Sequence, residues 1–134
     1  MEKHEIHEIL KKYFGYDTFR PGQEALVDAL LSGQDVLGIM PTGAGKSLCY
    51  QVPALMMNGI TLVISPLISL MKDQVNALVQ QGVSAAYLNR SLTETQYMKA
   101  LRNASNGVIN PLIPILNFIF ISFLIGMPDS GVTL

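Results

Sequence analysis

The feature that most constrains the fold of this chain is the run PTGAGKS at residues 41–47. It follows a short apolar stretch at residues 36–40, which is typical of a strand buried on both faces of a parallel sheet. A helical pattern begins directly after it, at Lys46. A strand, a glycine-bearing turn and a helix in this order predict an α/β domain whose turn binds phosphate groups.

The chemistry of the run fits a nucleoside triphosphate. Gly43 and Gly45 lack a Cβ, so backbone N–H groups can approach phosphate oxygens, and the positive end of the following helix adds to the attraction. We expect Lys46 to lie between the β- and γ-phosphates as the catalytic cation, and Ser47 to ligate Mg²⁺. The general pattern has glycine where this chain has Met40, but the short form TGxGKS is intact. The expected nucleotide-binding residues here are Thr42, Gly43, Ala44, Gly45, Lys46, Ser47 and Leu48.

Hydrophobic periodicity gives the rest of the order. The expected elements are helices over 2–13 and 23–31, a strand over 36–40, a helix over 46–57 with Pro53 inside it, a strand over 61–65, a helix over 66–82, a strand over 85–88 and a helix over 93–103. Strands that alternate with helices predict an open, mainly parallel sheet with right-handed crossovers.

Charge and cysteine content exclude some classes of protein. The net charge of −1 gives no overall basic signature, so any nucleic-acid contact must come from a local surface. Cys49 is the only cysteine, which excludes an internal disulfide and a cysteine-based zinc site, and we expect it to serve in packing. The charged N-terminus has no apolar run behind it, as expected of a cytoplasmic protein without a secretory signal.

The last part of the chain differs in composition from what precedes it. No charged residue occurs between Asn103 and Pro128, and residues 108–127 are rich in Ile, Leu and Phe. A helix of about 20 such residues could cross a membrane, although Pro111 and Pro114 argue against it. A frameshift or truncation would also produce such a tail. We therefore divide the chain into N-terminal helices (1–33), a partial nucleotide-binding lobe (34–103) and a divergent apolar tail (104–134).

Three blocks resemble the RecQ family of superfamily 2 helicases, over about residues 6–103. The run MPTGAGKSLCYQ at 40–51 resembles motif I, and FGYDTFRPGQ at 14–23 resembles the adenine-recognising motif 0. The run LVISPLISLMKDQ at 62–74 resembles motif Ia, whose loop touches single-stranded DNA. The resemblance implies a RecA-like P-loop NTPase, a three-layer sandwich with a mainly parallel sheet that is incomplete here and is followed by the apolar tail.

The resemblance also assigns roles. Tyr16 and Arg20 would sandwich the adenine ring, and Gln23 would pair with its N6 and N7 edge, for which a carboxamide has the right donor and acceptor. Ser65 and Pro66 would contact the DNA backbone. The implied cofactors are ATP and Mg²⁺, and the implied partner is single-stranded or branched DNA, with no small-molecule substrate beyond ATP. The implied activity is ATP-dependent 3′ to 5′ DNA unwinding in recombination and repair.

The parts of the RecQ pattern that hydrolyse ATP are absent from this sequence. No acidic residue lies between Glu94 and Asp129, so the carboxylates of motif II are missing, as is the second lobe with its arginine finger. We therefore expect an ATP-binding fragment that does not hydrolyse ATP by itself. Two alternatives remain: another kind of P-loop NTPase, which indifference to the base would favour, and a membrane-anchored, non-catalytic remnant.

Overall fold

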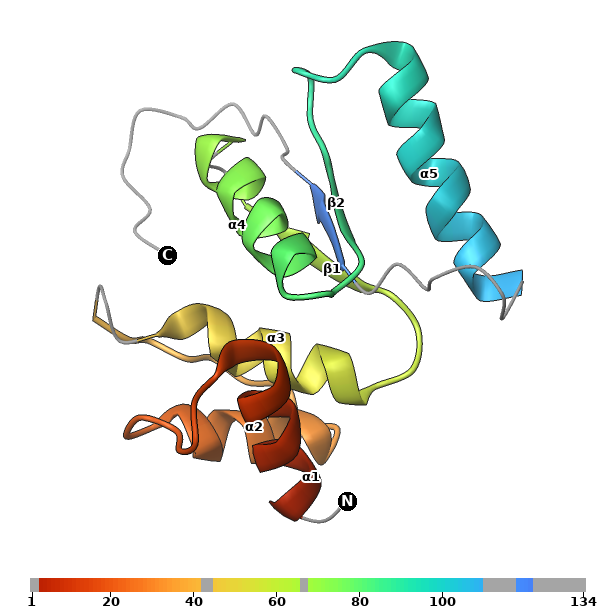
Figure 1. The fold of residues 1–134 in the computed structure, drawn as a ribbon. Coiled ribbons are helices and arrows are strands. Elements are labelled where there is room, and N and C mark those ends of the chain that lie inside the picture. Colours follow the sequence, from red (N-terminus) through yellow and green to blue (C-terminus); the bar gives the residue numbers. More distant parts are fainter. Residues whose placement is uncertain (1–2, 42–44, 66–67, 110–117, 122–134) are drawn as a thin grey trace.

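The computed structural model describes residues 3–41, 45–65, 68–109 and 118–121. The elements are helix α1 (Lys3–Ile9), the π-helical turn η1 (Leu10–Phe14), α2 (Gln23–Leu31), α3 (Lys46–Met56), β1 (Thr61–Ile64), α4 (Ile68–Gln80), β2 (Ala85–Leu88), α5 (Glu94–Ile109) and β3 (Phe118–Ile121). Figure 1 shows α1, α2 and α3 gathered at one end of the molecule, with the strands, α4 and α5 at the other. The expected helices and the strands near 61–65 and 85–88 are confirmed.

The strands form one parallel sheet in the order β1-β3-β2. Thr61 of β1 and Ala85 of β2 both pair with Phe118 of β3, so the central strand comes last in the sequence. This confirms a parallel α/β arrangement and corrects the interpretation of residues 108–127 as one continuous helix. Helix α5 continues past Asn103 to Ile109, and residues 118–121 are a strand. An uncharged, β-branched and aromatic run suits a strand with neighbours on both sides.

No helix among residues 3–41, 45–65 and 68–109 is long and apolar enough to cross a membrane. The other residues of the apolar segment, 110–117 and 122–127, lie outside the described part of the chain.

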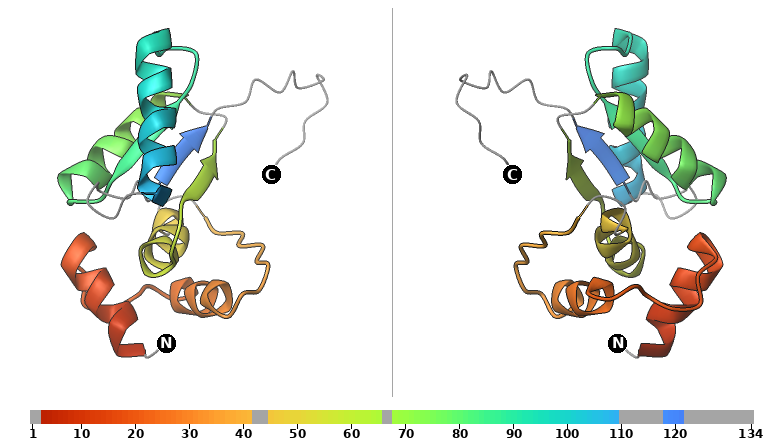
Figure 2. Two further views of the ribbon diagram at one scale, coloured as in Figure 1. Left: turned by 90° about the vertical axis from the view of Figure 1, so that its right-hand side faces the viewer. Right: turned by 90° about the vertical axis from the view of Figure 1, so that its left-hand side faces the viewer.

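The strand expected over residues 36–40 does not form, and that prediction is wrong. The segment is extended, but no described strand pairs with it, and Leu37 and Ile39 are 87% and 88% exposed. Figure 2 shows it running outside the sheet, between α2 and α3. The apolar pattern indicates a preference for burial, but a strand also needs a neighbour whose backbone groups complete its hydrogen bonds.

We expect the double substitution Leu37→Ser and Ile39→Ser to reduce self-association without lowering stability. These side chains contribute little to the core, so the free energy of unfolding should change by no more than about 0.5 kcal/mol. Light scattering and thermal unfolding of the purified chain would measure both effects. Val52→Ser is the matched control, because Val52 is fully buried and its replacement should cost about 1–3 kcal/mol. A similar loss in the double variant would contradict the exposed position of the segment.

Helix α3 joins the two ends of the molecule. Its Val52 packs with Ile6, Leu10 and Val27 of the N-terminal elements. Its Ala54 belongs to a second core cluster, which also contains Met71, Val75, Leu78 and Val83. Pro53 lies between these two residues and is buried, and the helix continues through it to Met56. The run at residues 41–47, called the phosphate loop below, therefore leads into a helix that packs against both core clusters.

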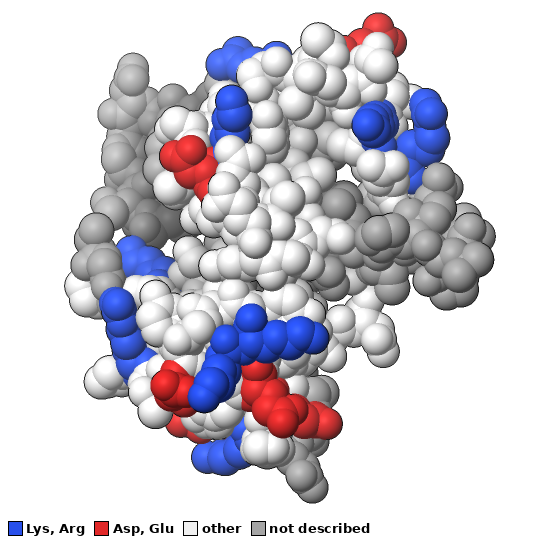
Figure 3. Space-filling model, in the orientation of Figure 1, with Lys and Arg blue, Asp and Glu red and all other residues white. Residues whose placement is uncertain are grey.

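Charged side chains of both signs lie close together on the face shown in Figure 3. One group of them covers the N-terminal helices at the lower end of the view, further basic and acidic side chains lie at the upper end, and the middle of this face is largely uncharged. Interspersed charges of opposite sign produce no strong field of one sign. This view therefore agrees with a net charge near zero and offers no broad basic surface.

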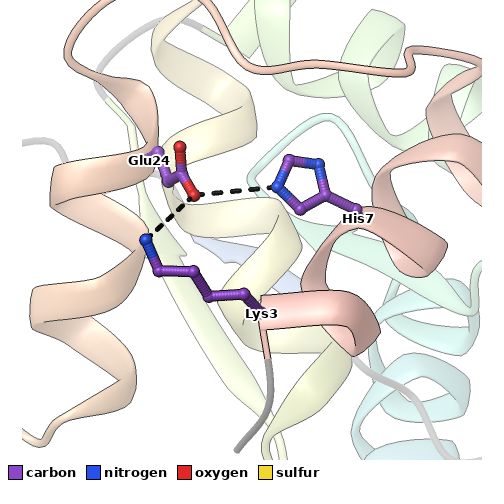
Figure 4. A network of polar contacts seen from close by, with 3 residues as sticks. All are labelled: Lys3, His7 and Glu24. Atoms are coloured by element: carbon purple, nitrogen blue, oxygen red, sulfur yellow. Dashed lines mark ion pairs between the residues drawn. The ribbon is translucent and has the colours of Figure 1, made fainter.

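A small polar network connects α1 to α2. Glu24 Oε1 lies 3.7 Å from Lys3 Nζ and 3.7 Å from His7 Nε2 (Figure 4). The His7 ring also meets the Phe19 ring edge-on, with 5.5 Å between centroids. Exposed ion pairs of this kind contribute at most about 1 kcal/mol. Their main consequence is positional, because His7 contacts both α2 and the loop that carries Tyr16 and Arg20.

Candidate nucleotide-binding site

The described part of the phosphate loop has the geometry expected of a helix start that binds anions. Gly45 caps α3 with φ 77° and ψ 42°, in the left-handed region that favours glycine. Lys46 begins the helix and is exposed, while Ser47 is partly buried in its first turn. N–H groups in the first turn of a helix have no partner within the helix and favour negative charge. Thr42, Gly43 and Ala44 lie outside the described residues.

Residues 14–23, called the adenine block below, and the described part of the phosphate loop line one cavity of about 220 Å³. Its lining residues are Phe14, Tyr16, Thr18, Arg20, Gln23, Gly45, Ser47, Leu48 and Gln81. Six of these residues, namely Tyr16, Arg20, Gln23, Gly45, Ser47 and Leu48, were predicted as nucleotide-binding from the sequence. Lys46 is not among them and lines a neighbouring cavity of about 320 Å³ beside Cys49 and Tyr50.

Sequence reasoning did not select three of the lining residues. Phe14 belongs to the adenine block itself, so its inclusion could have been anticipated, and Thr18 lies within the same loop. Gln81 follows α4 and carried no signal, because only the packing of α4 beside α3 brings it to the cavity.

Gln23 connects the two halves of the cavity. The side chain is 1% exposed, its Oε1 accepts a hydrogen bond from the Arg20 backbone N–H at 2.8 Å, and its Nε2 donates to the Gly45 carbonyl at 2.9 Å. Both ends of the carboxamide are thus engaged by backbone. The pairing of Gln23 with adenine stays a prediction, and it would have to add to these bonds or replace one of them.

The same contact explains why residue 45 is glycine. A Cβ at this position would collide with Nε2 of Gln23. Together with the positive φ, this leaves no room for another residue without moving either the loop or Gln23. The start of the phosphate loop helix and the adenine block are therefore built against each other.

Cys49 and Tyr50 lie in the first turns of α3, and both side chains are at least partly buried. The Cys49 thiol is buried, which raises its pKa, and it lies 3.7 Å from Met40 Sδ. The burial of Cys49 and its contact with Met40, at the end of the extended segment, agree with the expected packing role. Burial also raises the pKa of Tyr50, against the opposing effect of its hydrogen bonds with Ser47 and Gln74.

The side chains of the site could bind Mg²⁺ only together with the phosphate groups of a nucleotide. Among the residues described, no group of His, Cys, Asp and Glu could hold a metal ion. Mg²⁺ keeps several waters and commonly binds through one or two protein oxygens together with substrate phosphates. The Ser47 hydroxyl, in the first turn of α3 and on the cavity wall, can supply such an oxygen.

The block expected to contact DNA is only partly described. Ser65 follows β1 directly, at the carboxyl end of the strand, and is partly buried, whereas Pro66 lies outside the described residues. Ligands of parallel α/β sheets commonly bind at this edge. Lys72 lies on the exposed side of α4, as an ordinary solvated residue would.

Comparison with known proteins identifies the family. Residues 20–119 match the DEAD/DEAH box helicase family, so the match extends beyond residue 103 into β3. The chain is 53% identical over 105 residues to the ATP-dependent DNA helicase RecQ of Pasteurella multocida, covering 78% of this chain and 17% of that protein. It is 51% identical over 112 residues to the RecQ of Haemophilus influenzae, covering 84% and 18%, and 48% identical over 105 residues to that of Bacillus subtilis, covering 78% and 18%.

The chain thus spans less than a fifth of the length of these three relatives. The family match includes the end of the adenine block, the phosphate loop and the block after β1. Since it covers most of the chain, this protein belongs to the DEAD/DEAH box helicase family, and within it to the RecQ-type helicases.

Proposed function

We propose that this chain binds ATP or ADP with Mg²⁺ in the cavity between the adenine block and the phosphate loop. The observation that carries the proposal is the single cavity lined by Tyr16, Arg20 and Gln23 from one block and by Gly45 and Ser47 from the other. Because the blocks are separated in sequence, only folding brings an aromatic ring, a guanidinium and a helix start to the same space.

Each side chain has a defined task in this proposal. Tyr16 and Arg20 hold the base by stacking, for which a half-exposed tyrosine ring and a planar guanidinium are suited. The first turn of α3 receives the phosphates, and Lys46 turns from its exposed position to reach them. When bound through Ser47, Mg²⁺ would neutralise charge on the β- and γ-phosphates.

We base a proposal for the role of the whole protein on its family. The relatives named above are ATP-dependent DNA helicases. We propose that this chain is the ATP-binding part of a cytoplasmic enzyme that binds single-stranded or branched DNA and unwinds DNA 3′ to 5′ in recombination and repair. The complete lobe would be a three-layer sandwich. Further strands would then lie beside β1 and beside the segment at residues 36–40. By itself the chain binds nucleotide without hydrolysing it.

Calorimetric titration with ADP and GDP tests the base specificity. We expect ADP to bind at least about tenfold more tightly, because a site that pairs with a base edge leaves its own polar groups unsatisfied with the wrong base. Equal affinity for ADP and GDP would contradict the assignment of residues 14–23 to adenine recognition.

A phosphate-release assay with ATP, Mg²⁺ and single-stranded DNA tests the missing hydrolysis. We expect no release above the rate without protein. DNA-stimulated turnover by this chain would show that the carboxylates of motif II are not needed or are replaced from elsewhere.

A further inference from the structure

A glutamine outside the three blocks that resemble helicase motifs reaches the proposed nucleotide cavity. Gln81 lines this cavity together with the adenine block and the start of α3. It is exposed, and its side chain makes no hydrogen bond to any residue that the structure describes. Its carboxamide is therefore available to a ligand in the cavity.

The backbone around Gln81 has a defined conformation. The Val83 N–H donates to the Leu78 carbonyl at 2.9 Å. The N–H of Gly82, which has φ 85°, donates to the Val79 carbonyl at 3.0 Å. This pair of bonds is a Schellman motif, which ends a helix at a fixed residue. Gln81 is the last residue before the glycine of this motif, so its position at the end of α4 is well determined.

Apolar packing brings this end of α4 to the adenine block. Leu78 and Val83 are buried in the core cluster that also contains Ala54 of α3. Phe14, the first residue of the adenine block, packs against the same cluster. Gln81 lies between Leu78 and Val83 in sequence, so the core places it beside that block.

The polarity of the two helices distinguishes the parts of the cavity. The first turn of α3 has N–H groups that favour phosphate, whereas the carboxyl end of a helix carries partial negative charge. Gln81 lies at the carboxyl end of α4, where a phosphate group would be repelled. Its carboxamide therefore suits an uncharged part of the nucleotide.

An adenine nucleotide has two uncharged polar parts, which are the base edge and the ribose hydroxyls. In the proposed site the base belongs to Tyr16, Arg20 and Gln23. Thr18 and Gln81 are the other uncharged polar side chains of the cavity outside the helix start, and Thr18 belongs to the loop that carries the stacking residues. A ribose hydroxyl both donates and accepts hydrogen bonds, and a carboxamide does the same.

We propose that Gln81 binds the ribose hydroxyls of the adenine nucleotide and makes the site selective for a ribonucleotide. This role of Gln81 rests on the proposed nucleotide function of the cavity. It adds a third segment of the chain to the site, next to the adenine block and the phosphate loop. The measurable consequence is a preference for ADP over 2′,3′-dideoxy-ADP, which lacks both hydroxyls.

The test is calorimetric titration of the full chain with ADP and with 2′,3′-dideoxy-ADP, each with Mg²⁺. We expect the unaltered chain to bind ADP about tenfold more tightly, because each neutral hydrogen bond corresponds to about two- to tenfold in affinity. Gln81→Met has a similar size but forms no such bonds, so it should bind both nucleotides with the affinity that the unaltered chain has for the dideoxy form. Gln80→Met is the matched control, because Gln80 is the preceding residue, is also exposed and does not line the cavity. It should keep the full preference.

Gln81→Glu provides a second measurement. Its carboxylate can accept hydrogen bonds from both hydroxyls, so it should retain the preference for ADP even if repulsion from the phosphates lowers both affinities. If only the volume of the side chain mattered, the methionine and glutamate variants would behave alike. Because residue 81 is exposed, every variant should unfold at nearly the same temperature as the unaltered chain, which thermal unfolding would check.

The outcomes separate the role of Gln81 from the function on which it rests. If the unaltered chain binds no ADP, the proposed nucleotide site is wrong and the ribose contact falls with it. If the unaltered chain binds ADP and dideoxy-ADP equally, or if Gln81→Met keeps the full preference, the ribose contact is wrong while the nucleotide site stands. A Gln81→Met variant that loses the preference for ADP over GDP but keeps the ribose preference would assign Gln81 to the base edge, and this too would overturn the proposal.

Discussion

Replacing Lys46 by alanine is expected to abolish measurable binding of ATP and ADP and to leave the fold intact. Lys46 is exposed at the start of α3, so its side chain contributes little to the core. In the bound state its ammonium would make charge-assisted hydrogen bonds to phosphate oxygens, each worth about 1.5–3 kcal/mol. Two such bonds correspond to a loss of at least about 100-fold in affinity.

Calorimetry with ATP and ADP measures this effect, and circular dichroism checks the fold. Lys99→Ala is the matched control, since Lys99 is also an exposed lysine, lies on α5 and does not line the cavity. Its affinity for nucleotide should equal that of the unaltered chain. Retention of full ATP affinity by Lys46→Ala would show that the run at residues 41–47 is not the phosphate site.

Replacing Gln23 by methionine is expected to lower both stability and base selectivity. Methionine fills a similar volume, but it provides neither the acceptor for the Arg20 N–H nor the donor for the Gly45 carbonyl. Leaving a buried polar group without its partner costs about 1–3 kcal/mol, so we expect the free energy of unfolding to fall by at least that amount. ADP and GDP should then bind with nearly equal affinity.

Thermal unfolding and paired titrations with ADP and GDP measure the two consequences of Gln23→Met. Gln34→Met is the control, because Gln34 is exposed beyond the end of α2 and should change neither quantity. Lower stability with unchanged preference for ADP would mean that Gln23 holds Gly45 in place but does not recognise the base.

Local features of the sequence determined most of the helices and two of the strands. Gly15, in the left-handed conformation with φ 76°, ends the first helical segment where the sequence indicated, and α2 occupies residues 23–31 as expected. The strand at Ala85–Leu88 has the expected bounds. These elements depend on patterns that act over a few residues, namely apolar spacing and a backbone position that favours glycine.

The proposed chemistry of the site was also assigned mainly from the sequence. A run such as TGAGKS restricts the backbone and supplies its own donors, so its meaning depends little on the rest of the fold. The adenine block could be assigned by its resemblance to motif 0 alone. Its meeting with the phosphate loop in one cavity agrees with that assignment, although the role of each residue is a matter for the experiments above.

Only the tertiary structure decided what pairs with what. Residues 36–40 and 118–121 are both short apolar runs, yet one is exposed without a strand partner among the described residues and the other is the centre of the sheet. Their composition could not distinguish them, because a strand forms only where neighbouring strands complete its backbone hydrogen bonds. The same holds for Gln23, whose carboxamide bonds to Gly45, and for Tyr50, which bonds to Gln74 on α4. The sequence by itself determined most of the local conformations and the assignment of residues 41–47 to phosphate binding, while contacts between distant residues determined the sheet order and the polar connections around the site.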